Sequence, residues 1–448
     1  MIDAKTKQAI HLTPHDEATQ YSDVNFLSND EIIFGTNQNG EFITLCQMDW
    51  RTKKISGCSK ENWDLDSTAI SNSGEVTAWT INKEGFSEFY INKISFIKDR
   101  RFGELPEPSQ IKLPAKGIVG GLEFSKDGSK LAFTFSSARY NTDIWIYDLN
   151  AKTLTQVTKS SRVGIPQSSF VEPELVKYKT FDGREIPAWY YKPQPSIVTV
   201  NLGKNNISQT EKIDTSFHPP NGLPVIVSVH GGPEGQERPG FNPLYQYYLS
   251  RGYAILATNV SGSTGYGKTY SHLDDVRNRE NSVRDLAHAV EWLKTSGGAD
   301  AKRIAVMGGS YGGYMTLAAI TLYPDLWAAA VDTVGIGNWE TFLKNTSGYR
   351  RRQREVEYGM LDKDIDFLRR ISPIYKVGKI KTPLFVIHGK NDPRVPYTEA
   401  EQIVESLKKR GATVEYKLFA DEGHGVAKLK NRLELYPLVA DFLDKYMK

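Results

Sequence analysis

The sequence of 448 residues has few of the features that mark membrane, secreted or metal-binding proteins. Its two cysteines, Cys46 and Cys58, are too few for a small secreted domain held by several disulfides, and no Cys/His spacing indicates a zinc site. No run of apolar residues approaches the roughly 18 that a membrane helix requires, and the first residues lack the apolar stretch of a secretory signal. These absences predict a cytoplasmic protein without a membrane partner.

An excess of charge of one sign is also missing. The 56 lysines and arginines nearly balance the 53 aspartates and glutamates, which gives a formal net charge of +3. A near-neutral chain gives no reason to expect a nucleic-acid partner. The basic run Arg350–Arg352 with Arg354 is more typical of a solvated face than of a site for anionic ligands, and both interpretations stay open.

Helical periodicity is missing from about residue 1 to residue 165. Three similar segments there each have an alternating strand, a polar turn and a second strand that ends in an aromatic: 23–36, 67–80 and 121–134. Their aromatics, Phe34, Trp79 and Phe133, recur about every 50 residues, and further strand-like sequence follows each pair. Four strands at this period are typical of a propeller blade, and a β-sandwich of irregular hairpins is the alternative.

Three repeats are fewer than the roughly 4–8 blades that close a propeller. Segment Gln8–Thr13 resembles Leu154–Thr158, the expected last strand of a blade, so the chain is expected to begin at the end of a blade. We therefore expect residues 1–168 to form a partial all-β propeller of about three blades. Its open sheet edges need to be covered, and a homo-oligomer of this chain would cover them.

From residue 169 onward, strands alternate with helices. A hairpin of Leu175–Phe181 and Arg184–Tyr191 comes first, and a polar segment, 194–222, follows as an expected surface insertion. The apolar runs after it are separated by helical patterns, which predicts a doubly wound, mostly parallel sheet with helices on both faces. We expect residues 169–448 to form this α/β domain.

Residues 306–316, VMGGSYGGYMT, place four glycines around Ser310, between a predicted strand and a predicted helix. Such a turn is found in phosphate-binding loops and in nucleophile elbows, which expose a serine. A phosphate-binding loop needs Gly-Lys-Ser/Thr, and a dinucleotide fold needs its glycines in the first βα unit with an acid about 20 positions further on. Neither condition holds here, so the G-x-S-x-G at 308–312 predicts a nucleophile elbow.

A serine hydroxyl becomes nucleophilic when a histidine takes its proton and an acid orients that histidine. In an α/β-hydrolase these residues follow in the order Ser, Asp or Glu, His, each on a loop after a strand. Asp392 and His424 lie directly after the last two predicted strands, so the predicted catalytic triad is Ser310, Asp392 and His424. Asp421 is the alternative acid, and His388 is expected to be a packed, hydrogen-bonded histidine.

The tetrahedral intermediate of acyl transfer needs N–H donors for its oxyanion. The backbone N–H of Tyr311, at the start of a helix, is one expected donor. The second is expected from the glycine loop His230–Pro233, where the N–H of Gly232 is the candidate and a plain tight turn is the alternative. These residues imply neither a metal nor an organic cofactor.

Taken together, these motifs resemble the catalytic domain of the prolyl oligopeptidase family of serine peptidases, and most of all its acylaminoacyl-peptidase and bacterial dipeptidyl-peptidase branch. The matching stretches are HGGPEGQ (230–236), NVSGSTGYGKTY (259–270), GGSYGGYMT (308–316), SPIYKV (372–377), HGKNDPRVP (388–396) and DEGHG (421–425). The resemblance covers roughly residues 170–448. It implies a propeller joined to an α/β-hydrolase domain, the same triad, and short peptides as substrates.

The sequence thus predicts a serine peptidase that hydrolyses short peptides through an acyl-enzyme. It would act as an oligopeptidase or as an aminoacyl or dipeptidyl exopeptidase. Two alternatives stay open: a carboxylesterase would use the same triad, and a truncated product with an incomplete propeller would have little activity.

Overall fold

The computed structural model describes residues 1–38, 40–93, 108–193 and 221–448. The chain forms two compact units. The first unit comprises Met1–Gln167 with the short segments Arg238–Phe241 and Thr264–Thr269, and the second unit comprises the remaining residues from Ser168 to Lys448. Most of the expected insertion, residues 194–220, lies outside the described residues.

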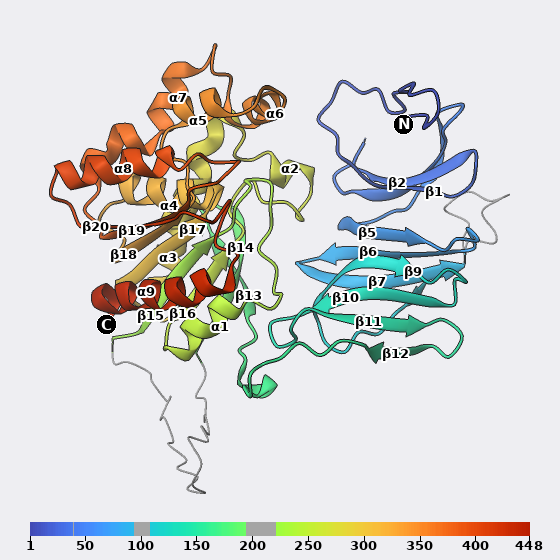
Figure 1. The fold of residues 1–448 in the computed structure, drawn as a ribbon, viewed down its shortest axis with the longest axis horizontal. Helices are drawn as coiled ribbons and strands as arrows, with labels where there is room; N and C mark the ends of the chain where they lie inside the picture. The colour runs from blue at the N-terminus through green and yellow to red at the C-terminus, as the bar shows by residue number, and fades with distance from the viewer. Residues whose placement is uncertain (39, 94–107, 194–220) are drawn as a thin grey trace, which may run out of the picture. The chain divides into compact units, whose positions relative to one another are not determined.

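The first unit contains three four-stranded antiparallel sheets (Figure 1). Their strand orders are β1-β2-β3-β4, β5-β6-β7-β8 and β12-β11-β10-β9. The strands are β1 (Tyr21–Phe26), β2 (Glu31–Thr36), β3 (Thr44–Asp49), β4 (Lys54–Cys58), β5 (Asp64–Ile70), β6 (Val76–Lys83), β7 (Phe86–Lys93), β8 (Ser109–Gln110), β9 (Ile118–Phe124), β10 (Lys130–Ser136), β11 (Asp143–Asp148) and β12 (Thr153–Gln156). Each of the three repeats read from the sequence is the first hairpin of one sheet, which confirms that part of the prediction.

Small apolar clusters hold these sheets together. In one cluster the rings of Phe89 and Phe133 meet edge to face with their centroids 5.0 Å apart. Phe34 lies in another, next to Cys46, which forms a disulfide with the directly paired Cys58. No pattern in the sequence predicts this pairing.

One prediction for the first unit is wrong. Gln8–Thr13 forms no strand, and the backbone there makes only an isolated bridge between Ile2 and Ala9. The first sheet starts at Tyr21 and pairs its four strands in sequence order. The segment therefore has an alternating sequence but no neighbouring strand with which to pair.

The second unit is built on one eight-stranded sheet in the order β13-β14-β16-β15-β17-β18-β19-β20. The strands are β13 (Glu174–Lys179), β14 (Glu185–Tyr191), β15 (Leu223–Val229), β16 (Ala254–Thr258), β17 (Ala299–Gly309), β18 (Ala329–Thr333), β19 (Leu384–Gly389) and β20 (Val414–Phe419). The hairpin β13–β14 is antiparallel at one edge, and the pairings from β16 through β20 are parallel. This confirms the mostly parallel sheet.

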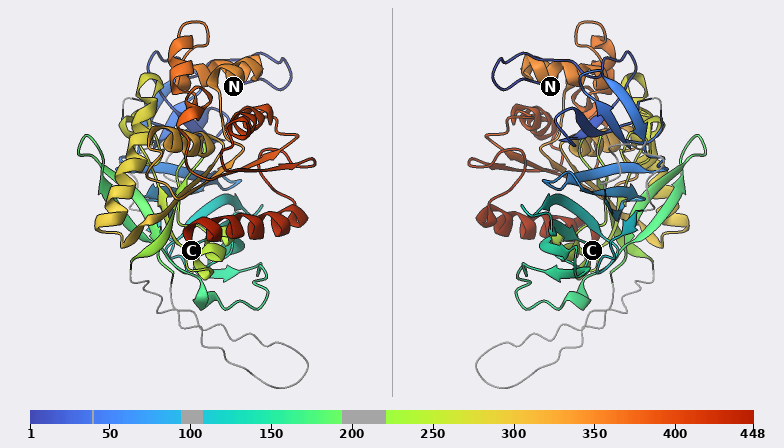
Figure 2. Two further views of the ribbon diagram at one scale, coloured as in Figure 1. Left: turned by 90° about the vertical axis from the view of Figure 1, so that its left-hand side faces the viewer. Right: turned by 90° about the vertical axis from the view of Figure 1, so that its right-hand side faces the viewer.

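Helices alternate with these strands (Figure 2). They are α1 (Pro243–Ser250), α2 (Lys268–Ser271), α3 (Arg279–Thr295), α4 (Tyr311–Leu322), α5 (Trp339–Asn345), α6 (Gly348–Tyr358), α7 (Ile365–Ile371), α8 (Thr398–Lys409) and α9 (Leu429–Met447). Apolar residues of the central strands and of α3 and α4 form one continuous core, in which Val306, Leu286 and Tyr314 are fully buried. The helix α4 begins immediately after β17, so the turn at Ser310 joins two elements that both contribute side chains to this core. Among the described residues, none of the helices has the length and apolar character needed to cross a bilayer.

Candidate active site

Ser310 occupies the sharp turn between β17 and α4. Its backbone has φ 60° and ψ −118°, a conformation that is costly for a residue with a side chain and is typical of functional sites. The N–H of Ser310 donates to the carbonyl of Thr333 at 2.9 Å, which ties the turn to the end of β18. A Cβ on Gly308 would collide with the carbonyl of Gly312, so the motif needs glycine there. Ser310 therefore lies in a strained strand–turn–helix, the backbone geometry that a nucleophile elbow requires.

Asp392 and His424 meet on the loops that follow β19 and β20. The Nδ1 of His424 lies 2.7 Å from Oδ2 of Asp392, whose side chain is fully buried. The other carboxylate oxygen, Oδ1, accepts from the N–H groups of Arg394 and Val395 at 2.8 and 2.9 Å. Burial acts to raise the pKa of Asp392, but the hydrogen bonds from His424, Val395 and Arg394 outweigh it and lower this pKa. Since a carboxylate only accepts, the Nδ1 of His424 donates, and its Nε2 is left to act as a base.

Ser310 stands on the same sheet as this pair, at the end of β17, and the structure places all three residues after carboxyl ends of parallel strands. Within the described part of the chain, no hydrogen bond joins the Ser310 hydroxyl to His424. Catalytic hydrogen bonds are often long before substrate binds. Ser310, Asp392 and His424 therefore stay the candidate catalytic residues although the bond between Ser310 and His424 is not formed among the described residues.

The alternative acid, Asp421, has other partners. Its carboxylate pairs with Lys428 at 2.9 Å and Lys430 at 3.0 Å on the surface, and these contacts lower its pKa. His388 is fully buried, and its Nε2 lies 2.9 Å from the carbonyl of Val395. His388 is thus a packed, hydrogen-bonded histidine, as expected.

The glycine loop after β15 runs directly against the elbow. A Cβ on Gly231 would approach the carbonyl oxygen of Gly309 at 3.1 Å and Cβ of Ser310 at 3.4 Å. The next residue, Gly232, is exposed and has φ 140°, which only glycine adopts without strain. Because Tyr311 is the first residue of α4, its N–H has no partner within the helix. Both expected oxyanion donors therefore lie beside Ser310 or on the loop that touches it.

His230 holds this loop from within. Its Nδ1 lies 2.8 Å from the carbonyl oxygen of Gly231, and its Nε2 lies 2.8 Å from Oγ of Ser263. A carbonyl only accepts, so Nδ1 carries the proton. Burial lowers the pKa of His230, which keeps the ring neutral.

Sequence reasoning missed a buried polar cluster beneath the elbow. Arg279, at the start of α3, is completely buried and donates to Asp274, to Glu357 and, at 3.0 Å, to the hydroxyl of Tyr311. In the sequence these charged residues lie in polar stretches that are typical of solvated surface, and no motif marks them.

Three acids of this region, Asp274, Asp275 and Glu357, come close enough together to hold a metal ion. The guanidinium of Arg279 already bridges two of them, Asp274 and Glu357. An arginine fork supplies the positive charge that these carboxylates need, so the cluster fits an internal ion-pair network rather than a metal centre.

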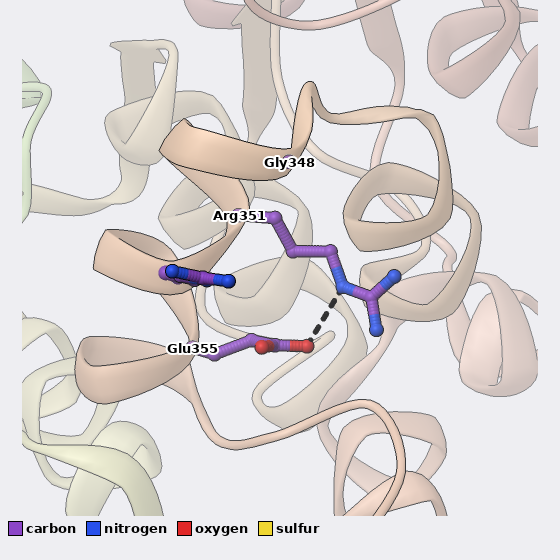
Figure 3. A pocket seen from close by; sticks show the side chains of 4 residues that line it. Gly348, Arg351 and Glu355 are labelled. Carbon is purple, nitrogen blue, oxygen red and sulfur yellow. Dashed lines mark hydrogen bonds and ion pairs between the residues drawn. The ribbon is translucent and has the colours of Figure 1, made fainter.

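The basic run of the sequence lies on α6. A cavity of about 510 Å³ there is lined by four α6 residues, Gly348, Arg351, Arg352 and Glu355. Figure 3 shows Arg351 pointing toward Glu355 across one turn of the helix. The Nε of Arg351 donates to Glu355 at 2.9 Å, while Arg352 is exposed. This pairing supports a solvated face for Arg351 and Arg352. Arg354 does not fit it, because its guanidinium is partly buried over the ring of Phe342, 4.5 Å from the ring centroid.

Comparisons with known proteins agree with this architecture. Residues 239–448 match the model of the prolyl oligopeptidase family. The chain is 29% identical over 364 residues to dipeptidyl peptidase family member 6 of Caenorhabditis elegans, covering 80% of this chain and 48% of that protein. It is 31% identical over 314 residues to dipeptidyl aminopeptidase BIII of Pseudoxanthomonas mexicana, covering 69% and 43%. The chain thus spans about half the length of these relatives.

Solved structures are similar over nearly the whole chain. A puromycin-hydrolyzing peptidase of Mycobacterium tuberculosis superposes with a TM-score of 0.82 at 19% identity, covering 96% of this chain and 62% of that one. This likeness is one of fold, a partial β-propeller joined to an α/β-hydrolase. Through residues 239–448 the chain belongs to the prolyl oligopeptidase family.

Proposed function

We propose that this protein is a serine peptidase that hydrolyses short peptides through an acyl-enzyme, with Ser310, Asp392 and His424 as its catalytic triad. One observation carries the proposal. A serine in a strained elbow stands on the same sheet as a His424–Asp392 pair that is joined at 2.7 Å. Domain boundaries at 1–168 and 169–448 are part of the proposal.

The proposed reaction follows from these positions. Nε2 of His424 takes the proton of Ser310 as Oγ attacks the peptide carbonyl, and Asp392 stabilises the imidazolium that forms. The N–H groups of Tyr311 and Gly232 hold the oxyanion. His424 then protonates the leaving amine, and a water molecule activated by the same histidine releases the acyl group from Ser310.

The substrate class is proposed from the relatives. Their names include a dipeptidyl aminopeptidase and acylamino-acid-releasing enzymes, which favours short peptides cleaved near the N-terminus. A carboxylesterase is the second candidate, because the same triad hydrolyses esters. The third candidate is a truncated product with little activity, since the chain spans about half the length of its relatives.

A labelling experiment tests the triad. A fluorophosphonate should label the wild-type protein at Ser310, and Ser310→Ala should abolish labelling, while Ser250→Ala on the exposed end of α1 should be labelled like the wild type. Labelling that persists in Ser310→Ala would refute the assignment.

A substrate panel separates the three candidates. Anilides of free dipeptides, N-acetyl-aminoacyl anilides and p-nitrophenyl esters are compared by kcat/KM. Hydrolysis of anilides supports the peptidase, hydrolysis of esters alone supports the carboxylesterase, and labelling without turnover of any of them supports the inactive product.

We also propose that a second copy of the chain covers the open first sheet. Val24 and Phe26 of β1 are 61% and 62% exposed, which is unusual for apolar strand residues. Sedimentation equilibrium should find a dimer that Phe26→Ser weakens. Val356→Ser, at an exposed position on α6, is the matched control, and a wild-type monomer would contradict the proposal.

The compartment stays a prediction with two opposing signals. The sequence predicts a cytoplasmic protein, whereas the Cys46–Cys58 disulfide is typical of oxidising compartments. Thiol labelling in cells lysed directly into denaturant decides between them, because Cys46 is buried in the folded protein. Two reactive thiols support the cytoplasm, and none supports an oxidising compartment.

A further inference from the structure

The two expected oxyanion donors come from distant parts of the chain, yet one buried cluster contacts both. Tyr311, which carries one donor N–H, is tied to Asp274 and Arg279 through its side-chain hydroxyl at 2.9 and 3.0 Å. Asp274 and Arg279 are completely buried. The residue that follows Ser310 is thus held by its side chain as well as by its helix.

Tyr358, the last residue of α6, connects this cluster to the other donor. Its hydroxyl donates to the carbonyl oxygen of Gly232 at 3.1 Å. Its ring stacks on the ring of Tyr311 with 6.3 Å between centroids and an interplanar angle of 15°. The guanidinium of Arg279 lies over both rings, 5.3 Å from Tyr311 and 5.0 Å from Tyr358.

Gly232 needs such an external partner. It has no side chain, it is exposed, and its φ of 140° belongs to a region in which glycine moves freely. The peptide that carries its N–H is held at the preceding carbonyl by His230, and the peptide that follows is held at its own carbonyl by Tyr358. Fixing the peptides on both sides of Gly232 fixes the direction of its N–H.

We propose that Tyr358 is a positioning residue of the oxyanion hole. Its hydroxyl holds Gly232 in a fixed position relative to Tyr311, and the guanidinium of Arg279 fixes the rings of the two tyrosines. This inference rests on the proposed function. A displacement of about 1 Å at such a donor reduces catalysis strongly, because the oxyanion bonds form only in the transition state. A buried tyrosine that merely satisfies its hydroxyl would affect stability and leave transition-state binding unchanged.

The variant Tyr358→Phe separates these two roles, since it removes the bond to Gly232 and keeps the ring. We expect kcat for a peptide anilide to fall about tenfold with KM nearly unchanged, as the loss of one hydrogen bond predicts. The affinity for a dipeptidyl boronic acid, which forms a tetrahedral adduct on Ser310, should fall by the same factor. The pH profile should keep its shape, because Asp392 and His424 are untouched.

Tyr178→Phe is the matched control. Tyr178 is equally buried in the second unit, and its hydroxyl bonds Thr258 at 2.7 Å, away from the glycine loop. This variant should lose similar thermal stability and keep kcat and boronic-acid affinity within twofold of the wild type. Arg279→Lys provides a second test, because it keeps the charge and loses the fork, and it should weaken boronic-acid binding at least as much as Tyr358→Phe.

The outcomes are distinct. Wild-type kcat and boronic-acid affinity in both Tyr358→Phe and Arg279→Lys would overturn the inference while leaving the peptidase intact. A wild-type protein that neither reacts with fluorophosphonate nor cleaves anilides would instead refute the proposed function. A loss of boronic-acid affinity in Tyr358→Phe but not in Tyr178→Phe supports the positioning role.

Discussion

The two units bury different kinds of polar side chain. In the described part of the first unit the buried polar residues are hydroxyl and amide side chains, with Asp143 as the one ionisable group among them. The second unit buries many ionisable side chains: Asp274, Arg279, Asp285, Asp332, Glu340, His388, Glu399 and Glu422. Two of them, Asp274 and Arg279, bond the hydroxyl of Tyr311, the residue after Ser310. Asp143 is itself held in a turn by Thr158, Ser160 and Gln156.

This difference separates folding from chemistry. Hydroxyl and amide groups complete the hydrogen bonds of turns and strands at little cost. A buried charge costs several kcal/mol unless partners surround it, so a cluster of such charges indicates a role beyond folding. The buried polar groups of the first unit therefore complete its sheets and turns, whereas the second unit also buries charged groups, of which Asp274 and Arg279 contact the proposed oxyanion site.

The sharpest test replaces one buried aspartate in each unit. Asp392→Asn should lower kcat by about 10⁴-fold, because an amide stabilises the wrong tautomer of His424. Asp143→Asn, a substitution of the same type in the first unit, should leave kcat within about twofold of the wild type. Steady-state kinetics on a peptide anilide measure both. Equal losses in the two variants would remove the functional distinction between the units.

The next test concerns the buried arginine. Arg279→Met leaves the carboxylates of Asp274 and Glu357 without their partner, and we expect the free energy of unfolding to fall by about 3–5 kcal/mol. In the first unit the pair of Arg51 and Asp30 is exposed on both sides, so Arg51→Met should cost less than about 1 kcal/mol. Urea unfolding compares the two variants. A small loss for Arg279→Met would show that the cluster is not an essential ion network.

The sequence was informative where chemistry imposes a fixed local pattern. The glycines around Ser310 predict the elbow because a Cβ at Gly308 or Gly312 meets backbone carbonyls, and the candidates Asp392 and His424 are predicted from their places after strands. Tyr358 and Arg279 act across distances that no local pattern records, and both lie in polar stretches that are typical of surface. The prediction of a strand at Gln8–Thr13 was wrong for a related reason. An alternating sequence permits a strand, but a partner strand decides whether the strand forms.

The third test uses pH. Burial raises the pKa of Asp332 to about 7 from 3.8, so the folded state holds a proton that the unfolded state has already released. Stability from this group is complete below about pH 4 and is lost as pH rises to about 7, by roughly 2–3 kcal/mol between pH 5 and pH 7. Asp332→Asn should remove that slope from the unfolding free energy. A slope unchanged in the variant would mean that other groups carry it.

The smallest expected effect is a change in unfolding free energy from a substitution at Ser87, in the first unit. The hydroxyl of Ser87 is buried there and accepts from the N–H of Val119 at 3.0 Å and from Arg238 at 3.1 Å. Ser87→Ala should cost about 1 kcal/mol, because it leaves a buried N–H without its partner. Since a serine hydroxyl does not titrate in this range, the loss should be the same at pH 5 and pH 7 in urea unfolding, unlike the effect of Asp332→Asn. A loss that changes with pH would show that the stability of the first unit also depends on ionisable groups, which the polar residues buried in its described part do not predict.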